Sequence, residues 1–165
     1  MPERRKQRER LALRGALLRL APPLETIAED VLGLVSRIDL VARDPDGAVT
    51  LILVANAGED LARLTEGFAQ RAWLAPRLAD WNQLAPHLAL ATERAVGLLL
   101  IASRFDERTR AAAAAVGQGG VLLVERLPRG DLDVELRVLE QAGVPTQAPV
   151  PEPRRDSGFR TGLRD

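Results

Sequence analysis

Carboxylates aside, this 165-residue sequence holds few side chains of the types that carry out covalent or acid–base chemistry. It has no cysteine, one histidine (His87) and one lysine (Lys6), and every other basic residue is arginine. Thiolate nucleophiles and thiolate metal sites are therefore excluded. A catalytic histidine needs a nucleophile and an orienting partner, and nothing near His87 forms such a set, so we expect it on the surface or in packing. Arginine keeps its proton near neutral pH and does not act as a base.

The carboxylate of greatest interest is Asp39, which lies in a stretch that reads as a β-hairpin. Two apolar runs flank Asp44-Pro45-Asp46-Gly47, where proline fixes φ and glycine accepts a positive φ. The pattern predicts antiparallel strands at 37–43 and 48–55, with Asp39 on the first. A carboxylate can hold a hard cation such as Mg²⁺, but metal-dependent phosphodiester hydrolysis needs several oxygen ligands and a group that positions or activates water.

This hairpin resembles the PD-(D/E)xK nuclease superfamily, particularly the branch of archaeal-type mismatch endonucleases and RecB-like nucleases. In that pattern an Ile-Asp-Leu strand carries a metal-binding Asp, and the strand after the turn ends in Glu-x-Lys. Residues 38–40 are Ile-Asp-Leu, so Asp39 takes the position of the family's Asp. The order of elements extends the resemblance over about 24–127.

Two departures from the family pattern remove its chemistry. Leu53 stands where the Glu belongs, and Ala55 stands where the Lys belongs. The resemblance therefore implies a degenerate site in which Asp39 is a remnant and Mg²⁺ binds poorly. We expect a cleft that is apolar and poor in negative oxygens, with no bound metal and no cofactor.

Asp39 also has a purely structural interpretation. It would then be a polar residue at the edge of the sheet, held by Arg37 two positions earlier, because an unpaired carboxylate in apolar surroundings is costly. Glu25 and Glu29 precede the hairpin and are either solvated acids or acids that face the same cleft.

The alternative to a degenerate site is a diverged Mg²⁺-dependent endonuclease. Some superfamily members have a second carboxylate that migrated to the following helix, so the resemblance offers Glu59, Asp60 or Glu66 for that role. Gln70 opens a segment similar to the helix of RecB-like members in which a Gln faces the site. Gln70 or an arginine would then replace the missing Lys.

The charge distribution is uneven, although the formal net charge is zero. Residues 1–19 hold seven basic and two acidic residues, and the middle of the chain is acidic. Phosphate neutralisation supplies most nucleic-acid affinity, so any such binding should begin at the N-terminal basic cluster: Arg4, Arg5, Lys6, Arg8 and Arg10. The other interpretation is a solvated helix face whose leucine side docks on the domain or on a second copy.

Hydrophobic periodicity and breaker residues predict the elements. Helices are expected at 4–20, about 60–75, roughly 79–91 and 107–116, with the last opened by Ser103-x-x-Asp106. Strands are expected at 31–35, in the hairpin, at 96–102 and at 120–126, and 24–30 is either helix or a lead into a strand. Residues 132–141 form a helix or a strand. The strand, helix, strand order at 96–126 predicts a right-handed crossover and parallel strands.

These observations give an α/β fold with a mixed central β-sheet, an antiparallel meander followed by a parallel crossover strand, flanked by helices in a restriction-endonuclease-like core. We expect a basic N-terminal helix at 1–23, the α/β domain at 24–141 and a disordered Pro/Arg-rich tail at 142–165. The expected function is a catalytically inactive nuclease-fold module that binds nucleic acid or acts as a scaffold. The third possibility is a protein-interaction domain that self-associates through its N-terminal helix. Cysteine usage fits the cytoplasm, and no membrane partner is expected.

Overall fold

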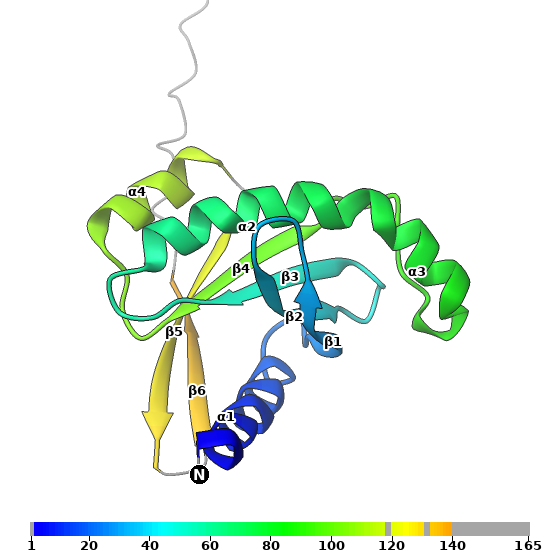
Figure 1. Cartoon of the computed structure of the whole chain (residues 1–165). Coiled ribbons are helices and arrows are strands. Elements are labelled where there is room, and N and C mark those ends of the chain that lie inside the picture. The colour runs from blue at the N-terminus through cyan, green and yellow to red at the C-terminus, as the bar shows by residue number, and fades with distance from the viewer. Residues whose placement is uncertain (1, 118–119, 131–132, 140–165) are drawn as a thin grey trace, which may run out of the picture.

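The computed structural model describes residues 2–117, 120–130 and 133–139, with side chains from residue 5 onward (Figure 1). These residues form an α/β structure around one six-stranded sheet. Its elements are α1 (Pro2–Leu17), β1 (Glu25–Leu32), β2 (Arg37–Arg43), β3 (Val49–Val54), α2 (Asp60–Leu74), a 3-10 turn (Ala75–Arg77), α3 (Leu78–Leu84), a second 3-10 turn (Pro86–Leu88), β4 (Gly97–Ala102), α4 (Glu107–Ala115), β5 (Leu122–Arg129) and β6 (Asp133–Val138).

The sheet is mixed, as the sequence predicts. Its strands follow chain order from β1 to β6. The first three pair antiparallel as a meander, β4 and β5 add in parallel, and β6 closes the series antiparallel to β5. The carboxyl ends of β3, β4 and β5 therefore lie along the same end of the sheet, where α/β proteins commonly hold ligands.

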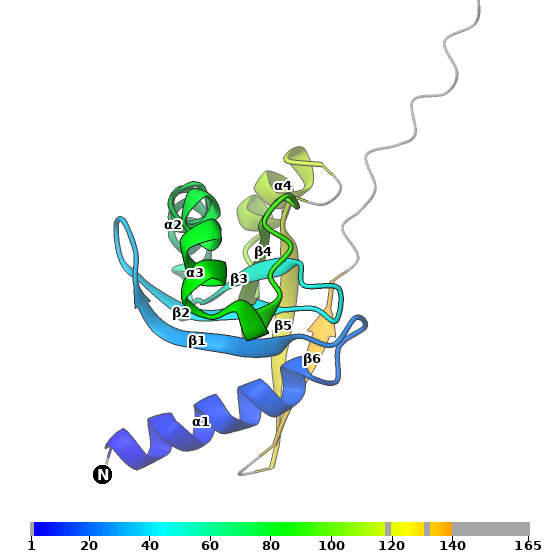
Figure 2. The ribbon, with the colours of Figure 1, turned by 90° about the vertical axis from the view of Figure 1, so that its right-hand side faces the viewer.

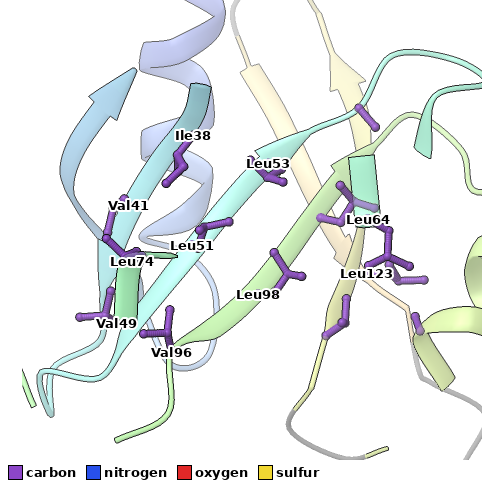
Figure 3. Packing of buried hydrophobic residues seen from close by; sticks show 14 of the residues in the cluster. Ile38, Val41, Val49, Leu51, Leu53, Leu64, Leu74, Val96, Leu98 and Leu123 are labelled. Carbon is purple, nitrogen blue, oxygen red and sulfur yellow. The ribbon is translucent and has the colours of Figure 1, made fainter. Parts of the chain in front are cut away.

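Helices cover both faces of the sheet (Figure 2). On one face α2, α3 and α4 pack over a core that includes Leu51, Leu53, Leu64 and Leu98 (Figure 3). On the other face α1 lies across the strands. Its leucine side chains join a second core with Leu40, Ile52, Leu99 and Val124.

The basic N-terminal helix is thus bound to its own domain. Leu13 and Leu17 are 6% and 0% exposed, which confirms docking of the leucine side on the sheet. Burying a leucine fully stabilises the fold by about 1.5–3 kcal/mol. At the end of the helix, Arg19 forms an ion pair with Asp133 of β6 at 2.9 Å.

The hairpin is formed as predicted, with strands at 37–43 and 49–54. The backbone N–H groups of Asp46 and Ala48 both donate to Asp44 Oδ1 at 2.9 Å. Gly47 takes a φ of +82°, and a Cβ there would lie 2.3 Å from the carbonyl oxygen of Ala89. This turn requires glycine for its φ and for its close backbone neighbour.

Three local predictions are wrong or incomplete. The helix expected at roughly 79–91 ends at Leu84, and a 3-10 turn follows at Pro86–Leu88. The first strand spans Glu25–Leu32, and residues 33–36 form the β1–β2 turn, so the strand expected at 31–35 is wrong. The apolar side chains after Leu32 are exposed, with Leu34 at 63% and Val35 at 59%, so apolarity here does not reflect burial in the sheet. The ambiguous segment at 132–141 contains strand β6. The predicted tail lies outside the described residues.

No helix among residues 2–117, 120–130 and 133–139 combines the length and apolarity needed to cross a bilayer.

Candidate functional site

A cleft of about 740 Å³ lies between α1 and α2, where β2 begins and β3, β4 and β5 approach their carboxyl ends. Its lining includes the buried side chains of Leu40, Ala55 and Ala102. Its charged lining residues are Lys6, Glu9, Arg10, Asp39, Glu59, Arg63, Glu66 and Arg126. The fold therefore brings Asp39, Glu59 and Glu66 to one cleft, as the alternative nuclease hypothesis requires.

Asp39 is paired inside the protein. Its Oδ2 accepts hydrogen bonds from Val54 N and from Arg63 Nη2, both at 2.8 Å. The Asp39 side chain is 32% exposed and that of Arg63 only 18%. The predicted partner, Arg37, is wrong: its guanidinium donates instead to the carbonyl oxygen of Asp30 at 3.2 Å. Arg63 can reach Asp39 because α2 crosses the sheet beside the ends of β2 and β3.

Arg63 bridges two carboxylates of the cleft, Asp39 and Glu66. Its Nη1 lies 2.5 Å from Glu66 Oε2 and 3.1 Å from Ser36 Oγ. Its remaining N–H groups reach the carbonyl oxygens of Val54 and Arg37 at 3.3 and 3.2 Å. Burial alone would lower the pKa of Arg63, but the hydrogen bonds with Asp39 and Glu66 outweigh it and raise the pKa. The guanidinium therefore stays charged and holds both acids.

Glu66 forms an ion pair with Arg63 and a hydrogen bond with Ser36. The hydrogen bond from Arg63 lowers the pKa of Glu66, against the effect of burial, and Ser36 Oγ adds a second hydrogen bond at 2.9 Å. Glu59 accepts from Asn56 Nδ2 at 2.8 Å. The third candidate, Asp60, does not line the cleft: it is 3% exposed and accepts from Asp106 N at 2.8 Å, which joins the beginnings of α2 and α4.

The cleft is lined by four acids, Glu9, Asp39, Glu59 and Glu66, and the expected weak binding of Mg²⁺ stays a prediction. Two of these acids, Asp39 and Glu66, are paired with Arg63. Among the described residues no group of three or more His, Cys, Asp or Glu could hold a metal ion. Leu53 is fully buried in the apolar core and Ala55 is 7% exposed, so neither position contributes a polar group.

Gln70 does not line the cleft. It is fully buried, its Oε1 accepts from Leu34 N at 2.8 Å, and its Nε2 donates to the carbonyl oxygen of Ser36 at 2.6 Å. A Cβ on Gly33 would lie 2.0 Å from that Oε1. Gln70 thus fixes the β1–β2 turn against α2, and a polar residue within the buried stripe of a helix was the sequence signal for such a role.

Two of the predicted nucleic-acid-binding side chains have partners within the described residues. Arg5 pairs with Glu9 at 3.1 Å, and Arg10 pairs with Asp30 at 2.6 Å. Lys6 and Arg8 are exposed and form no ion pair or side-chain hydrogen bond with any described residue. The side chain of Arg4 lies outside the described residues. Of this cluster, Lys6 and Arg10 face the cleft.

Neither Glu25 nor Glu29 lines the cleft. Glu25 pairs with Arg43 at 2.9 Å, and Glu29 pairs with Arg14 at 3.1 Å. Both acids therefore serve as partners within the domain.

Two residues of the cleft were not anticipated as site residues. Arg63 lies three residues before Glu66, a spacing at which helical side chains of opposite charge meet, so this pair could have been found in the sequence. Arg126 comes two residues after the apolar run at 121–124. Only the sheet order places it opposite α1.

No protein-family model, curated protein or solved structure matches this chain. The resemblance to PD-(D/E)xK nucleases therefore rests on the hairpin and the order of elements, and it stays a prediction.

Proposed function

We propose that this chain is a catalytically inactive member of the PD-(D/E)xK nuclease superfamily that binds nucleic acid without a metal cofactor. The observation that carries the proposal is the position of Arg63, whose guanidinium occupies the space between Asp39 and Glu66. A divalent cation would need the same carboxylate oxygens.

Displacement of Arg63 by a metal would be unfavourable. The arginine side chain is 18% exposed, and a half-buried charge that loses its partners keeps its desolvation cost. A cation beside it would also meet a like charge at close range. The position of the family's Lys is taken by Ala55, so no group that could lose a proton replaces it.

The affinity for nucleic acid is assigned to Lys6, Arg8 and Arg10 on α1 and to the adjoining cleft. Supporting this, Lys6 and Arg8 form no ion pair with a described residue and are therefore available to phosphates. Such binding should weaken steeply as salt rises. The absence of cysteine from the sequence fits a reducing compartment, and we place the protein in the cytoplasm.

A cleavage assay tests the inactive assignment. Purified protein is incubated with labelled DNA and with labelled RNA in Mg²⁺, in Mn²⁺ and in EDTA, and we expect no metal-dependent product. Cutting that requires metal and disappears in Asp39→Ala would overturn the proposal.

One observation favours a diverged Mg²⁺-dependent endonuclease as the second candidate. Asp39, Glu59 and Glu66 do line a single cleft. This function requires Arg63 to swing away and release its two acids. It predicts that Glu66→Gln or Glu59→Gln abolishes cutting, and the same cleavage assay decides between the two functions.

Self-association through α1 is a third proposal, but the leucine side of the helix expected to form the interface is already buried in the domain. Leu13 and Leu17 are buried against the sheet, whereas Leu11 and Leu18 are 59% and 55% exposed. A dimer formed through α1 would therefore use Leu11 and Leu18. Light scattering on the wild-type protein and on Leu11→Ser/Leu18→Ser tests it, and a monomeric wild-type protein would exclude it.

A further inference from the structure

Arg126 is a half-buried arginine that no described residue pairs with. It lies on β5 and lines the cleft, and it forms no ion pair or side-chain hydrogen bond with a described residue. Its neighbour Glu125 shows the usual arrangement: this 6% exposed acid is held by Arg110 at 3.3 Å and by Arg137. A charged group that is shielded from solvent normally has a partner of opposite charge, so we expect Arg126 to bind an anion from outside the described residues.

The alternation of β5 explains why these neighbours differ. Successive strand residues point to opposite faces, and Val124 belongs to the core beneath α1. Arg126, two residues later, shares that face and lines the same cleft as Lys6 of α1. Two unpaired cations from distant parts of the sequence therefore line the same cleft.

The other charges of the cleft are already engaged among the described residues. Glu9 pairs with Arg5, and Arg63 holds Asp39 and Glu66. Glu59 is the one lining carboxylate without a cation partner in the described part of the chain, and it accepts from Asn56. Lys6 and Arg126 are thus two unpaired cations in the cleft lining, and together they suit an anion with several oxygens.

We infer that Lys6 and Arg126 each contact a phosphate of a single-stranded nucleic acid in this cleft. This inference deepens the proposed function and rests on it. The volume of about 740 Å³ lies within the range of small-ligand sites, roughly 300–1,000 Å³, so it accommodates a short stretch of one strand between α1 and α2. The exposed alanines of the lining, Ala57 and Ala62, offer apolar contact to a base, and the cations contact the backbone.

The test is fluorescence anisotropy with the full-length protein and a labelled DNA strand, its RNA counterpart and the DNA duplex, over a range of salt. Each phosphate contact to a single strand contributes about 0.7 to the slope of log affinity against log salt. We expect Arg126→Gln and Lys6→Gln each to reduce that slope by about 0.7 and to weaken single-strand binding several-fold. Arg94→Gln, before β4 and outside the cleft lining, is the matched control and should leave the slope unchanged.

A stability measurement separates binding from a structural role. Arg126→Gln removes a half-buried unpaired charge, so its unfolding temperature should equal or exceed that of the wild type. A lower unfolding temperature together with an unchanged slope would assign Arg126 to the fold and overturn the inference. Lys6 is exposed, so Lys6→Gln should fold in any case.

The outcomes distinguish this inference from the proposed function. Single-strand binding that Arg126→Gln leaves unchanged would overturn the cleft site and leave nucleic-acid binding standing. Tighter binding of the duplex than of either strand would overturn the single-strand assignment. Absence of binding to every nucleic acid at low salt would refute both, and stabilisation by a mononucleotide alone would replace the strand with a small phosphate ligand.

Discussion

Replacing Arg63 with methionine tests the internal counterion directly. The substitution keeps most of the side chain's volume, removes its charge and leaves Asp39 and Glu66 without their cation. Removing one partner of a fully buried ion pair costs about 3–5 kcal/mol, and an exposed pair is worth about 0–1 kcal/mol. Arg63 is 18% exposed and its acids are 32% and 37% exposed, so we expect a loss of about 2 kcal/mol.

Urea unfolding followed by circular dichroism at pH 7 measures this loss. In a chain of this size 1 kcal/mol corresponds to roughly 2–4 °C, so Arg63→Met should unfold about 4–8 °C below the wild type. Arg71→Met is the control on the same helix. Arg71 donates to the carbonyl oxygen of Gly120 at 2.7 Å and has no ion pair with a described residue, so its loss should be smaller.

The same variant tests whether Arg63 keeps metal out. With Asp39 and Glu66 released, Arg63→Met should gain weak affinity for Mn²⁺ that the wild type lacks. A ligand present at ten times its dissociation constant stabilises by about 1.4 kcal/mol, which would raise the unfolding temperature of the variant by roughly 3–6 °C. An equal Mn²⁺ shift in wild type and variant would refute the reasoning, as would a variant as stable as the wild type.

Three further measurements test the packing and the polar contacts. Leu17→Ala should lower the free energy of unfolding by about 2–5 kcal/mol, whereas Leu18→Ala, at an exposed position, should change it by less than about 0.5 kcal/mol. Equal losses in urea unfolding would contradict docking of α1 on the sheet. Gln70→Ala leaves backbone groups of the β1–β2 turn unpaired, so it should lower the free energy of unfolding by about 2 kcal/mol and speed amide exchange in that turn. Unchanged exchange would contradict the role of Gln70 in fixing the turn. Arg63 lowers the folded-state pKa of Glu66. The stability that Glu66 contributes is therefore present above its unfolded-state pKa of about 4.3 and is lost as pH falls through the lower folded value. Glu66→Gln should flatten the profile of stability against pH below about pH 4.5, and an unaltered profile would contradict the pairing.

The sequence by itself determined the strands, the helices and much of their order. Gly47 and Pro45 define the hairpin turn, because only a few residue types accept its backbone angles. The apolar runs at 96–102 and 121–124 indicated buried parallel strands, and the leucine spacing of α1 indicated one apolar face. These features are local, so neighbouring residues suffice to predict them.

The partners of the polar side chains were decided by the tertiary structure. Asp39 has Arg37 two residues away in sequence, yet it pairs with Arg63, which comes 24 residues later on a helix that crosses the sheet. Gln70 likewise fixes a turn 36 residues earlier, and Arg126 meets the cleft of Lys6 only because β5 lies beside β4 over α1. Ion pairs and hydrogen bonds depend on distances of a few ångströms between distant segments, and those distances follow from the packing of the elements, which residue spacing alone does not encode.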